Sequence, residues 1–400
     1  MSKKQKIEAA KKAFAEQEAL RLQNLENAKT ERLSEDDCTF VQMDERLHDQ
    51  KFEHEPISFY KDAWLRFKQN KASIVAAAII LVIVLMAIFA PVFSGTSYRE
   101  QHTEFGVLPP RIPYLENLGI ADGCRTMEIQ KSVLDTYGDA VVEVIREYNQ
   151  YYRGKPIPMV EAKVNQYILK GADDYYFFFG TDNLGRDLWV RLWRGTRISL
   201  IIGVCSVLIN CFIGVVYGAV SGYYGGKVDM LMQRIIEILG GVPFLVMAIL
   251  FVMFLGAGIR SFILVLIITG WIGMSRMIRA QFFRYKDYEY VLASRTMGAS
   301  DRRLIFRHIL PNAIGPIITQ ATFAVPSAIF SESFLSYLGL GIQAPEPSIG
   351  VLLAEGQGSL TTSPHLTLFP AIVVSLLMLS FNLFGNGLRD AFDPRARGSE

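Results

Sequence analysis

Long apolar stretches recur along this 400-residue chain. Five of them run for 21 to 29 residues without a charge: Ala72–Phe93, Ile198–Gly226, Ile238–Gly258, Ile309–Ser331 and Leu366–Leu388. The hydrocarbon core of a bilayer needs roughly 20 apolar residues per helix, and helices of soluble proteins seldom run this long without a charge. A sixth stretch, 261–280, carries Arg276 and Arg279 at one end only, where long side chains reach the headgroups. The pattern predicts an all-α polytopic membrane protein with six transmembrane helices.

The distribution of Lys and Arg predicts which way the chain faces. With a cytoplasmic N-terminus, the inner segments carry 17 Lys and Arg, whereas the short outer loops carry only Arg260. Those inner segments are 56–71, 223–237, 276–308 and 389–400. Because cytoplasmic loops retain positive charge, we expect both termini in the cytoplasm.

The polar remainder divides the chain into five segments. We expect a cytoplasmic extension at 1–55, an interfacial helix and the first span at 56–97, an extracytoplasmic insertion at 98–179, a core with five spans at 180–395, and a tail at 396–400. Apolar residues of the insertion recur at helical spacing, namely Ile129, Val133, Tyr137, Val141, Val144, Ile145 and Tyr148, followed by Val160, Val164 and Ile168. This spacing predicts a small, mostly helical insertion.

Catalytic and metal-binding motifs are missing from the sequence. It contains no Walker A loop, HExxH, CxxC or GxSxG pattern, so we expect no catalytic residue, no bound metal and no cofactor on this chain. Cys124 has no second cysteine in its compartment, so no intrachain disulfide is expected. Few ionisable residues lie within the spans, so uphill transport would have to draw its energy from another chain.

The sequence of the cytoplasmic loop 281–311 predicts a helix–turn–helix connection that could act as a mechanical element. Its sequence, RYKDYEYVLASRTMGASDRRLIFRHILPN over 284–312, predicts a short helix at 288–297 that Gly298 ends in a left-handed conformation. Ala293 and Ser294 are small enough to let a partner surface approach closely. A second, basic helix is expected at 301–308, with Pro311 in the first turn of the fifth span.

This loop resembles the EAA loop of ABC importer permeases, with which Ala293, Ser294, Gly298, Leu310 and Pro311 agree. Leu292 and His308 depart from the generic pattern. Four other stretches resemble a narrower group, the C-type permease subunit of oligopeptide and dipeptide importers. They are DAWLRFKQNK (62–71), FGTDNLGRDLWVRLWRGTRISL (179–200), FLSYLGLGIQAPEPSIGVLLAEG (334–356) and GLRDAFDP (387–394).

The resemblance implies a type I ABC importer permease fold in a bacterial cytoplasmic membrane. Its implied partners are a homologous B-type permease subunit, two ATP-binding subunits that hold ATP and Mg, an extracytoplasmic peptide-binding protein and the lipid bilayer, with no role for nucleic acid. It implies that the loop couples this chain to the ATPases. The residues expected in that contact are Tyr288, Glu289, Leu292, Ala293, Ser294, Gly298, Leu310 and Pro311.

Several polar residues are candidates for the pathway or its gate. Glu332, in the fifth span, either meets a peptide amino terminus or packs against neighbouring helices. Asp182, Arg186 and Asp187 either form an external gate or docking edge, or build a structural turn. The geometry of the folded chain has to decide between these alternatives.

The function implied by the resemblance is the permease subunit of an importer for oligopeptides or dipeptides. An alternative within the family is import of nickel or another small solute. A stand-alone secondary transporter or channel is a different class, disfavoured by the scarcity of charges in the spans and by the coupling loop. A membrane enzyme would need a nucleophile or a metal constellation that the sequence lacks.

Overall fold

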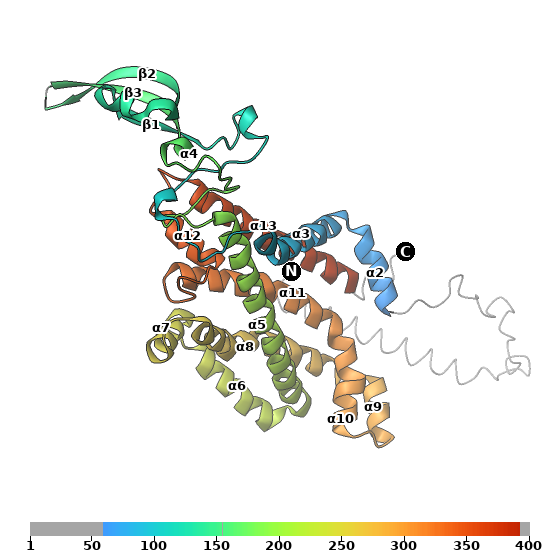
Figure 1. The fold of residues 1–400 in the computed structure, drawn as a ribbon. Helices are drawn as coiled ribbons and strands as arrows, with labels where there is room; N and C mark the ends of the chain where they lie inside the picture. The colour runs from blue at the N-terminus through green and yellow to red at the C-terminus, as the bar shows by residue number, and fades with distance from the viewer. Residues whose placement is uncertain (1–58, 154, 393–400) are drawn as a thin grey trace, which may run out of the picture. The chain divides into compact units, whose positions relative to one another are not determined.

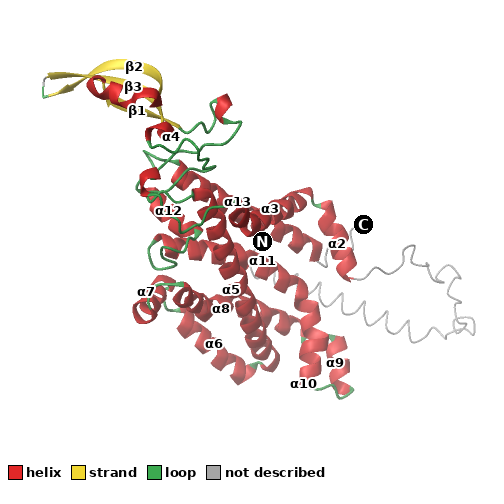
Figure 2. Ribbon diagram, viewed as in Figure 1, coloured by secondary structure: helices red, strands yellow, loops and turns green. Residues whose placement is uncertain are grey.

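The computed structural model describes residues 59–153 and 155–392. This part of the chain is helical apart from one small sheet (Figures 1 and 2). The predicted extension 1–55 and tail 396–400 lie outside the described residues.

The long helices coincide with the apolar stretches of the sequence, and shorter helices lie between them. They are α2 (Phe59–Gln69), α3 (Lys71–Phe93), α4 (Gln166–Leu169), α5 (Leu188–Tyr224), α6 (Gly226–Gly240), α7 (Phe244–Leu255), α8 (Ile259–Tyr285), α9 (Glu289–Thr296), α10 (Asp301–Arg303), α11 (Ile314–Tyr337), α12 (Ile349–Gln357) and α13 (His365–Phe392). Helix α2 occupies the segment where an interfacial helix was expected. Asn70 separates it from α3, and its side chain caps α3 by accepting a hydrogen bond from the Ser73 amide (3.2 Å).

Five helices in the described residues are long and apolar enough to cross a bilayer: α3, α5, α8, the continuous helix Asp301–Tyr337, and α13. The third predicted span is not one straight helix, because α6 and α7 meet at an angle of 75°. The break falls at Gly240-Gly241-Val242-Pro243, where Pro243 lacks an amide hydrogen and cannot continue the ladder of α6. The count reaches the predicted six if this bent pair is one span.

The predicted boundary between the loop and the fifth span is wrong. Helix α10 runs without a stop into α11 through a π-helical turn (Leu304–Ile309) and a 3₁₀ turn (Leu310–Ala313). Pro311 therefore lies inside a continuous helix instead of opening one. Its missing amide and its ring conflict with regular α-helical bonding one turn earlier, and the chain adapts by widening and then tightening its turns.

The predicted helical character of the insertion is also wrong. Its main element is an antiparallel sheet in the order β1-β3-β2, formed by β1 (Cys124–Gln130), β2 (Val141–Tyr152) and β3 (Lys155–Asn165). Helical turns in the insertion are limited to α4 and the 3₁₀ segments Thr103–Phe105, Glu116–Leu118 and Lys131–Ala140.

The alternation of buried residues in β3 explains this outcome. Val160, Ala162 and Val164 are fully buried on one face, which is the period of a strand. β2 opens with the run Val141-Val142-Glu143-Val144-Ile145, whose β-branched side chains favour strands. The helical spacing in the sequence arose because apolar residues of two strands and a 3₁₀ segment follow one another closely.

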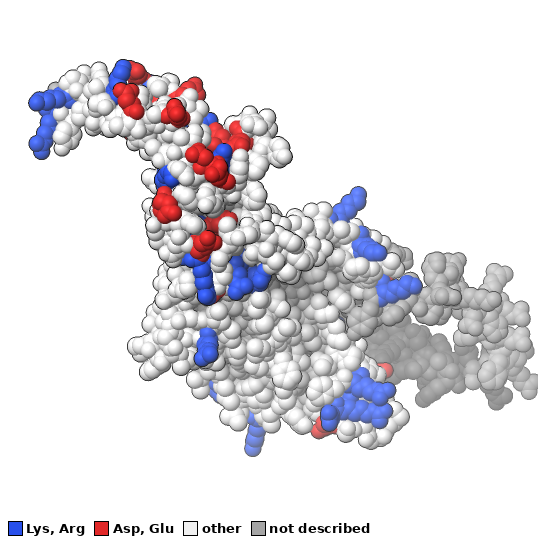
Figure 3. All heavy atoms as spheres, in the orientation of Figure 1, with Lys and Arg blue, Asp and Glu red and all other residues white. Residues whose placement is uncertain are grey.

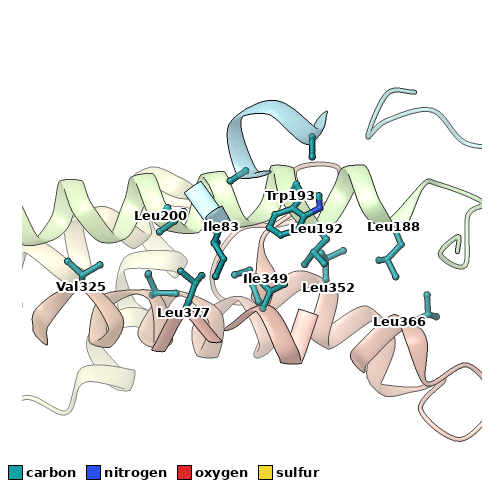
Figure 4. Packing of buried hydrophobic residues seen from close by; sticks show 14 of the residues in the cluster. Ile83, Leu188, Leu192, Trp193, Leu200, Val325, Ile349, Leu352, Leu366 and Leu377 are labelled. Carbon is teal, nitrogen blue, oxygen red and sulfur yellow. The ribbon is translucent and has the colours of Figure 1, made fainter. Parts of the chain in front are cut away.

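Helix α5 is the central element of the helical bundle. Leu188, Leu192, Trp193 and Leu200 of α5 pack with residues of α3, α11, α12 and α13 in the largest buried cluster (Figure 4). On another side, Gly214, Gly218 and Gly222 lie so close to α8 that a Cβ at each would be within 3 Å of α8 atoms. Small residues at four-residue spacing allow this close helix contact.

Helix α5 is longer than a bilayer core is thick. Its 37 residues span about 55 Å at 1.5 Å per residue, against about 30 Å of hydrocarbon. Both of its ends therefore reach beyond the apolar layer, where polar side chains can connect it to other segments. The insertion sheet lies toward one end of the bundle and α9 toward the other (Figure 1).

Candidate functional site

Helix α9 is a short surface helix with a defined end. The Gly298 amide donates to the Arg295 carbonyl (3.0 Å) and the Ala299 amide to the Ser294 carbonyl (3.1 Å), which is the Schellman pattern. Gly298 adopts φ +85°, a conformation that L side chains rarely take. The predicted short helix ended by Gly298 is confirmed.

One face of α9 fixes the helix to the bundle. Val291 is fully buried and belongs to a cluster with Phe282 of α8 and with Leu304 and Ile309 of the following helix. Ser294 is also buried, and its hydroxyl donates to the Tyr290 carbonyl (2.8 Å). Ser294 therefore faces the chain's own core, not the surface that a partner would touch.

The opposite face of α9 is exposed and mixed in character. We name it the docking patch; it consists of Tyr288, Glu289, Tyr290, Leu292, Ala293 and Met297. Leu292 is 42% exposed and Met297 81% exposed, which is unusual for side chains that gain free energy from burial. A shallow pocket lies at the start of the patch, lined by residues 287–290. Of the two other predicted coupling residues, Leu310 is half-buried and Pro311 exposed on the helix that follows.

A polar tie connects the α9 region to the end of α5. The Tyr223 hydroxyl donates to an Asp301 carboxylate oxygen (2.5 Å) and accepts from an Arg295 guanidinium nitrogen (3.4 Å). We name these three residues the Tyr223 tie. Nothing in the sequence pointed to it, because Tyr223 lies 78 residues before Asp301.

An ion pair lies near the same end of the bundle. Arg279 of α8 binds both carboxylate oxygens of Asp229 in α6, at 2.6 Å each. The Ser221 hydroxyl of α5 donates to the same carboxylate (2.5 Å). Three helices are thus joined by one carboxylate beside the α9 region.

Glu332 is fully buried inside the bundle. Its carboxylate accepts hydrogen bonds from the hydroxyls of Ser199 in α5 (2.6 Å) and Ser336 in α11 (2.8 Å). Of the two alternatives posed by the sequence, this geometry favours helix packing, because the carboxylate reaches no surface of the described chain.

Asp182, Arg186 and Asp187 form a structured turn before α5. One Asp182 carboxylate oxygen accepts from the amides of Leu184 (2.9 Å) and Arg186 (3.0 Å), and the other accepts from Arg186 Nε (2.6 Å). Asp187 caps α5 by accepting from the Trp189 amide (2.9 Å). This geometry favours the structural turn over an open gate.

The turn continues into a buried cluster of charges that the sequence did not reveal. Arg191 of α5 has no exposed surface and donates both to Asp182 and to Glu355 of α12, the latter at 2.5 and 3.1 Å. Arg186 also reaches Glu355 (3.3 Å). We name Asp182, Arg186, Arg191 and Glu355 the buried charge cluster. Two positive and two negative side chains balance there, so the buried charges compensate one another.

No group of three or more His, Cys, Asp or Glu side chains in the described residues has an arrangement that could hold a metal ion. The three cysteines in this part of the chain, Cys124, Cys205 and Cys211, are free thiols.

Comparison with known proteins identifies the family. A family profile described as "Binding-protein-dependent transport system inner membrane component" matches residues 214–398, and "N-terminal TM domain of oligopeptide transport permease C" matches 58–110. The "Oligopeptide transport system permease protein OppC" of Bacillus subtilis (strain 168) is 39% identical over 348 residues, covering 87% of this chain and 93% of the relative. The chain belongs to this family of transport permeases. It is therefore a multi-pass membrane protein, and the predicted permease fold of the mostly helical chain is confirmed.

Other permeases similar to this chain are named for different substrates. The "Dipeptide transport system permease protein DppC" of Bacillus subtilis (strain 168) is 39% identical over 342 residues, covering 85% of this chain and 87% of the relative. The "Glutathione transport system permease protein GsiD" of Pectobacterium atrosepticum is 37% identical over 220 residues, covering 55% and 73%. The two profiles leave residues 111–213 unmatched, and the insertion sheet lies in this gap.

Proposed function

We propose that this chain is the permease subunit of an ATP-driven importer and forms half of a translocation pathway for oligopeptides or dipeptides. The single observation that carries the coupling role is the docking patch, an exposed apolar and aromatic surface on a helix anchored from behind. Membership in the permease family and the peptide names of its relatives support the substrate class.

The proposed assembly contains a homologous B-type permease subunit, two ATPases that bind ATP and Mg, and an extracytoplasmic peptide-binding protein. ATP hydrolysis belongs to the ATPases, and this chain acts as their mechanical partner. The docking patch sits in a groove on one ATPase. Tyr, Met and Leu side chains suit such a groove, since aromatic residues and Met are enriched at protein interfaces.

The proposed orientation places the docking patch in the cytoplasm of a bacterial cell and the insertion sheet outside. The excess of Lys and Arg around the α9 region supports this orientation, and Arg302, Arg303 and Arg307 lie on the helix that follows α9 (Figure 3). Both termini are then cytoplasmic.

The proposed mechanism is a switch between two conformations. Closure of the two ATPases moves α9, and α9 moves the bundle through its two connections. The first is the packing of Val291 against α8 and the helix after α9, and the second is the Tyr223 tie to α5. A ligand shifts such an equilibrium only through different contacts in the two states, so ATP must change the contact at the docking patch.

Gly298 gives the sharpest test of coupling. A Cβ at this position meets no atom within 4 Å, so a substitution acts through the backbone conformation alone. Gly298→Val forces a β-branched residue into the left-handed region, which costs about 1–2 kcal/mol and distorts the end of α9. We expect the complex to assemble in proteoliposomes while ATP-driven peptide uptake is lost.

Gly298→Asn is the matched control, because Asn tolerates left-handed backbone better than other side chains. It should keep most of the uptake. Equal uptake by the Val and wild-type proteins would refute the coupling role. Uptake of a solute other than peptides by the wild-type complex, with no competition from peptides, would refute the proposed substrate class.

A further inference from the structure

The insertion carries a hairpin, formed by β2 and β3, that projects away from the helical bundle (Figure 1). The sheet has a small core of its own, formed by Ile129, Ala140, Val160, Ala162 and Val164. It lies in the part of the chain that the two family profiles leave unmatched.

The outer third of this hairpin has only two strands. β1 pairs with β3 as far as Met159, and beyond that point β3 is paired with β2 alone, up to the pair Tyr152 and Lys155. Pro156 and Pro158 lie in that part of β3 and block pairing along its free edge. A two-stranded hairpin is only marginally stable in water, so it gains from a partner surface.

β2 is the exposed strand of the sheet. None of its 12 residues is buried, and Tyr151 and Tyr152 near its end are 73% and 63% exposed. β2 therefore adds little to the core of the insertion. Its exposed surface is available for contact with another molecule.

The hairpin tip has a distinct chemistry. Residues 148–160 contain no Asp or Glu but include Arg153 and Lys155, so this segment is positively charged while acidic residues flank it (Figure 3). The guanidinium of Arg153 lies 5.7 Å from the Tyr152 ring centroid. Tyr and Arg are the residues most enriched among the energetically important contacts of protein interfaces.

The sheet is attached to the end of the bundle remote from α9. Arg125 of β1 donates to the Ser363 hydroxyl, between α12 and α13 (2.9 Å). A partner at this end differs from the ATPases that α9 would meet. The family description itself names the further component, a binding protein.

We propose that the hairpin tip, Tyr151, Tyr152, Arg153 and Lys155, docks an acidic surface of the binding protein that delivers substrate. A protein is favoured over lipid headgroups because the family description names a binding protein, and because Tyr and Arg side chains fit a carboxylate-bearing protein surface. This inference rests on the proposed function, since it requires an importer with a binding protein.

The test uses the whole complex in phosphatidylcholine nanodiscs. The probe is the purified peptide-binding protein that supports ATP-driven uptake by the wild-type complex in proteoliposomes. The double variant Arg153→Glu/Lys155→Glu should weaken its binding at least tenfold, as measured by biolayer interferometry. Binding to the wild type should weaken as salt rises, while the residual binding of the variant should not.

Two controls keep the result interpretable. Lys131→Glu reverses another exposed cation of the insertion and should leave binding unchanged, because its ion pair with Glu147 is a surface pair of little strength. Arg153→Lys/Lys155→Arg keeps both charges and should bind like the wild type. Equal yields of assembled complex establish that each variant folds.

Each other outcome has a defined meaning. Unchanged affinity of the double-reversal variant, with uptake intact in the wild type, would overturn the docking role and leave the proposed function standing. Loss of binding to phosphatidylglycerol vesicles instead of to the binding protein would assign the tip to lipid and also overturn the proposal. If no peptide-binding protein supported uptake, the proposed function would fail first and this inference with it.

Discussion

The two ends of α5 are held in different ways. At its beginning, Arg191 is fully buried and bonded to Asp182 and Glu355 in the buried charge cluster. At its other end, Tyr223 joins Asp301 and Arg295, both of which are exposed. Three of the four charges at the first end are buried and Glu355 is half-buried. The other end is held by the Tyr223 tie, whose two charged members are exposed, and by the contact of Ser221 with Asp229.

This difference separates a fixed end from an adjustable one. Breaking a buried ion pair leaves an uncompensated charge and is costly, while water can replace a surface hydrogen bond. A helix that transmits movement needs such an asymmetry. In the proposed mechanism, the end near α9 changes partners as α9 moves, and the end near α12 preserves the fold.

Arg191 gives the largest expected effect. Arg191→Met removes the shared partner of Asp182 and Glu355, and loss of one member of a buried pair costs about 3–5 kcal/mol. We expect little folded protein, measured as the monodisperse peak after detergent extraction and as a lower unfolding temperature. Arg99→Met is the control at the same end, because Arg99 pairs with Glu346 at an exposed site. Equal losses in both variants would abolish the distinction between buried and exposed charges.

Glu332 lies between the two ends and sharpens the comparison. Glu332→Leu leaves the buried hydroxyls of Ser199 and Ser336 without their acceptor, which costs about 1–3 kcal/mol. Glu332→Gln keeps an acceptor of the same shape and should be nearly neutral. Uptake of charged and uncharged peptides should fall in the same proportion in the Leu variant. A selective loss for one charge class would instead indicate that Glu332 meets the substrate.

The Tyr223 tie should affect transport more than stability. Tyr223→Phe removes one hydroxyl and costs about 0.5–1.5 kcal/mol, because exposed Asp301 can turn to water. We expect normal yield, a several-fold lower uptake rate and ATP hydrolysis that no longer responds to substrate. Tyr224→Phe is the neighbouring control and should change neither rate. Unaltered uptake in Tyr223→Phe would show that the Tyr223 tie has no part in transport.

Cys124 gives the smallest effect, on labelling only. Burial raises the pKa of its thiol to about 11, so little thiolate exists near neutral pH. In a variant without the other three cysteines, an impermeant maleimide should react slowly from outside intact cells. The rate should rise about tenfold per pH unit while the pH stays well below the pKa. Fast, pH-independent labelling would contradict the raised pKa of this half-buried thiol, and labelling only after lysis would reverse the proposed orientation.

The sequence predicted some features of the α9 region correctly and missed others. The helix and its end at Gly298 were predictable because they depend on neighbours in the chain. The inward direction of Ser294 was not, since it depends on which face of α9 meets α8. Tyr223 meets Asp301, 78 residues away, and Arg191 meets Glu355, 164 residues away, and no local pattern connects these pairs.

The sequence by itself determined the membrane-spanning character, the approximate positions of the spans and the family motifs. These depend on runs of apolar residues and on spacing between near neighbours in the chain. The thickness of the bilayer sets the length of such a run. The tertiary structure alone decided that the insertion forms a sheet and that Glu332 is buried and hydrogen-bonded to serine hydroxyls. It also decided that one end of α5 joins the buried charge cluster, while the other end joins exposed charged residues through Tyr223. Pairing between strands and ion pairs between distant helices depend on which segments meet in space, and long-range packing settles that.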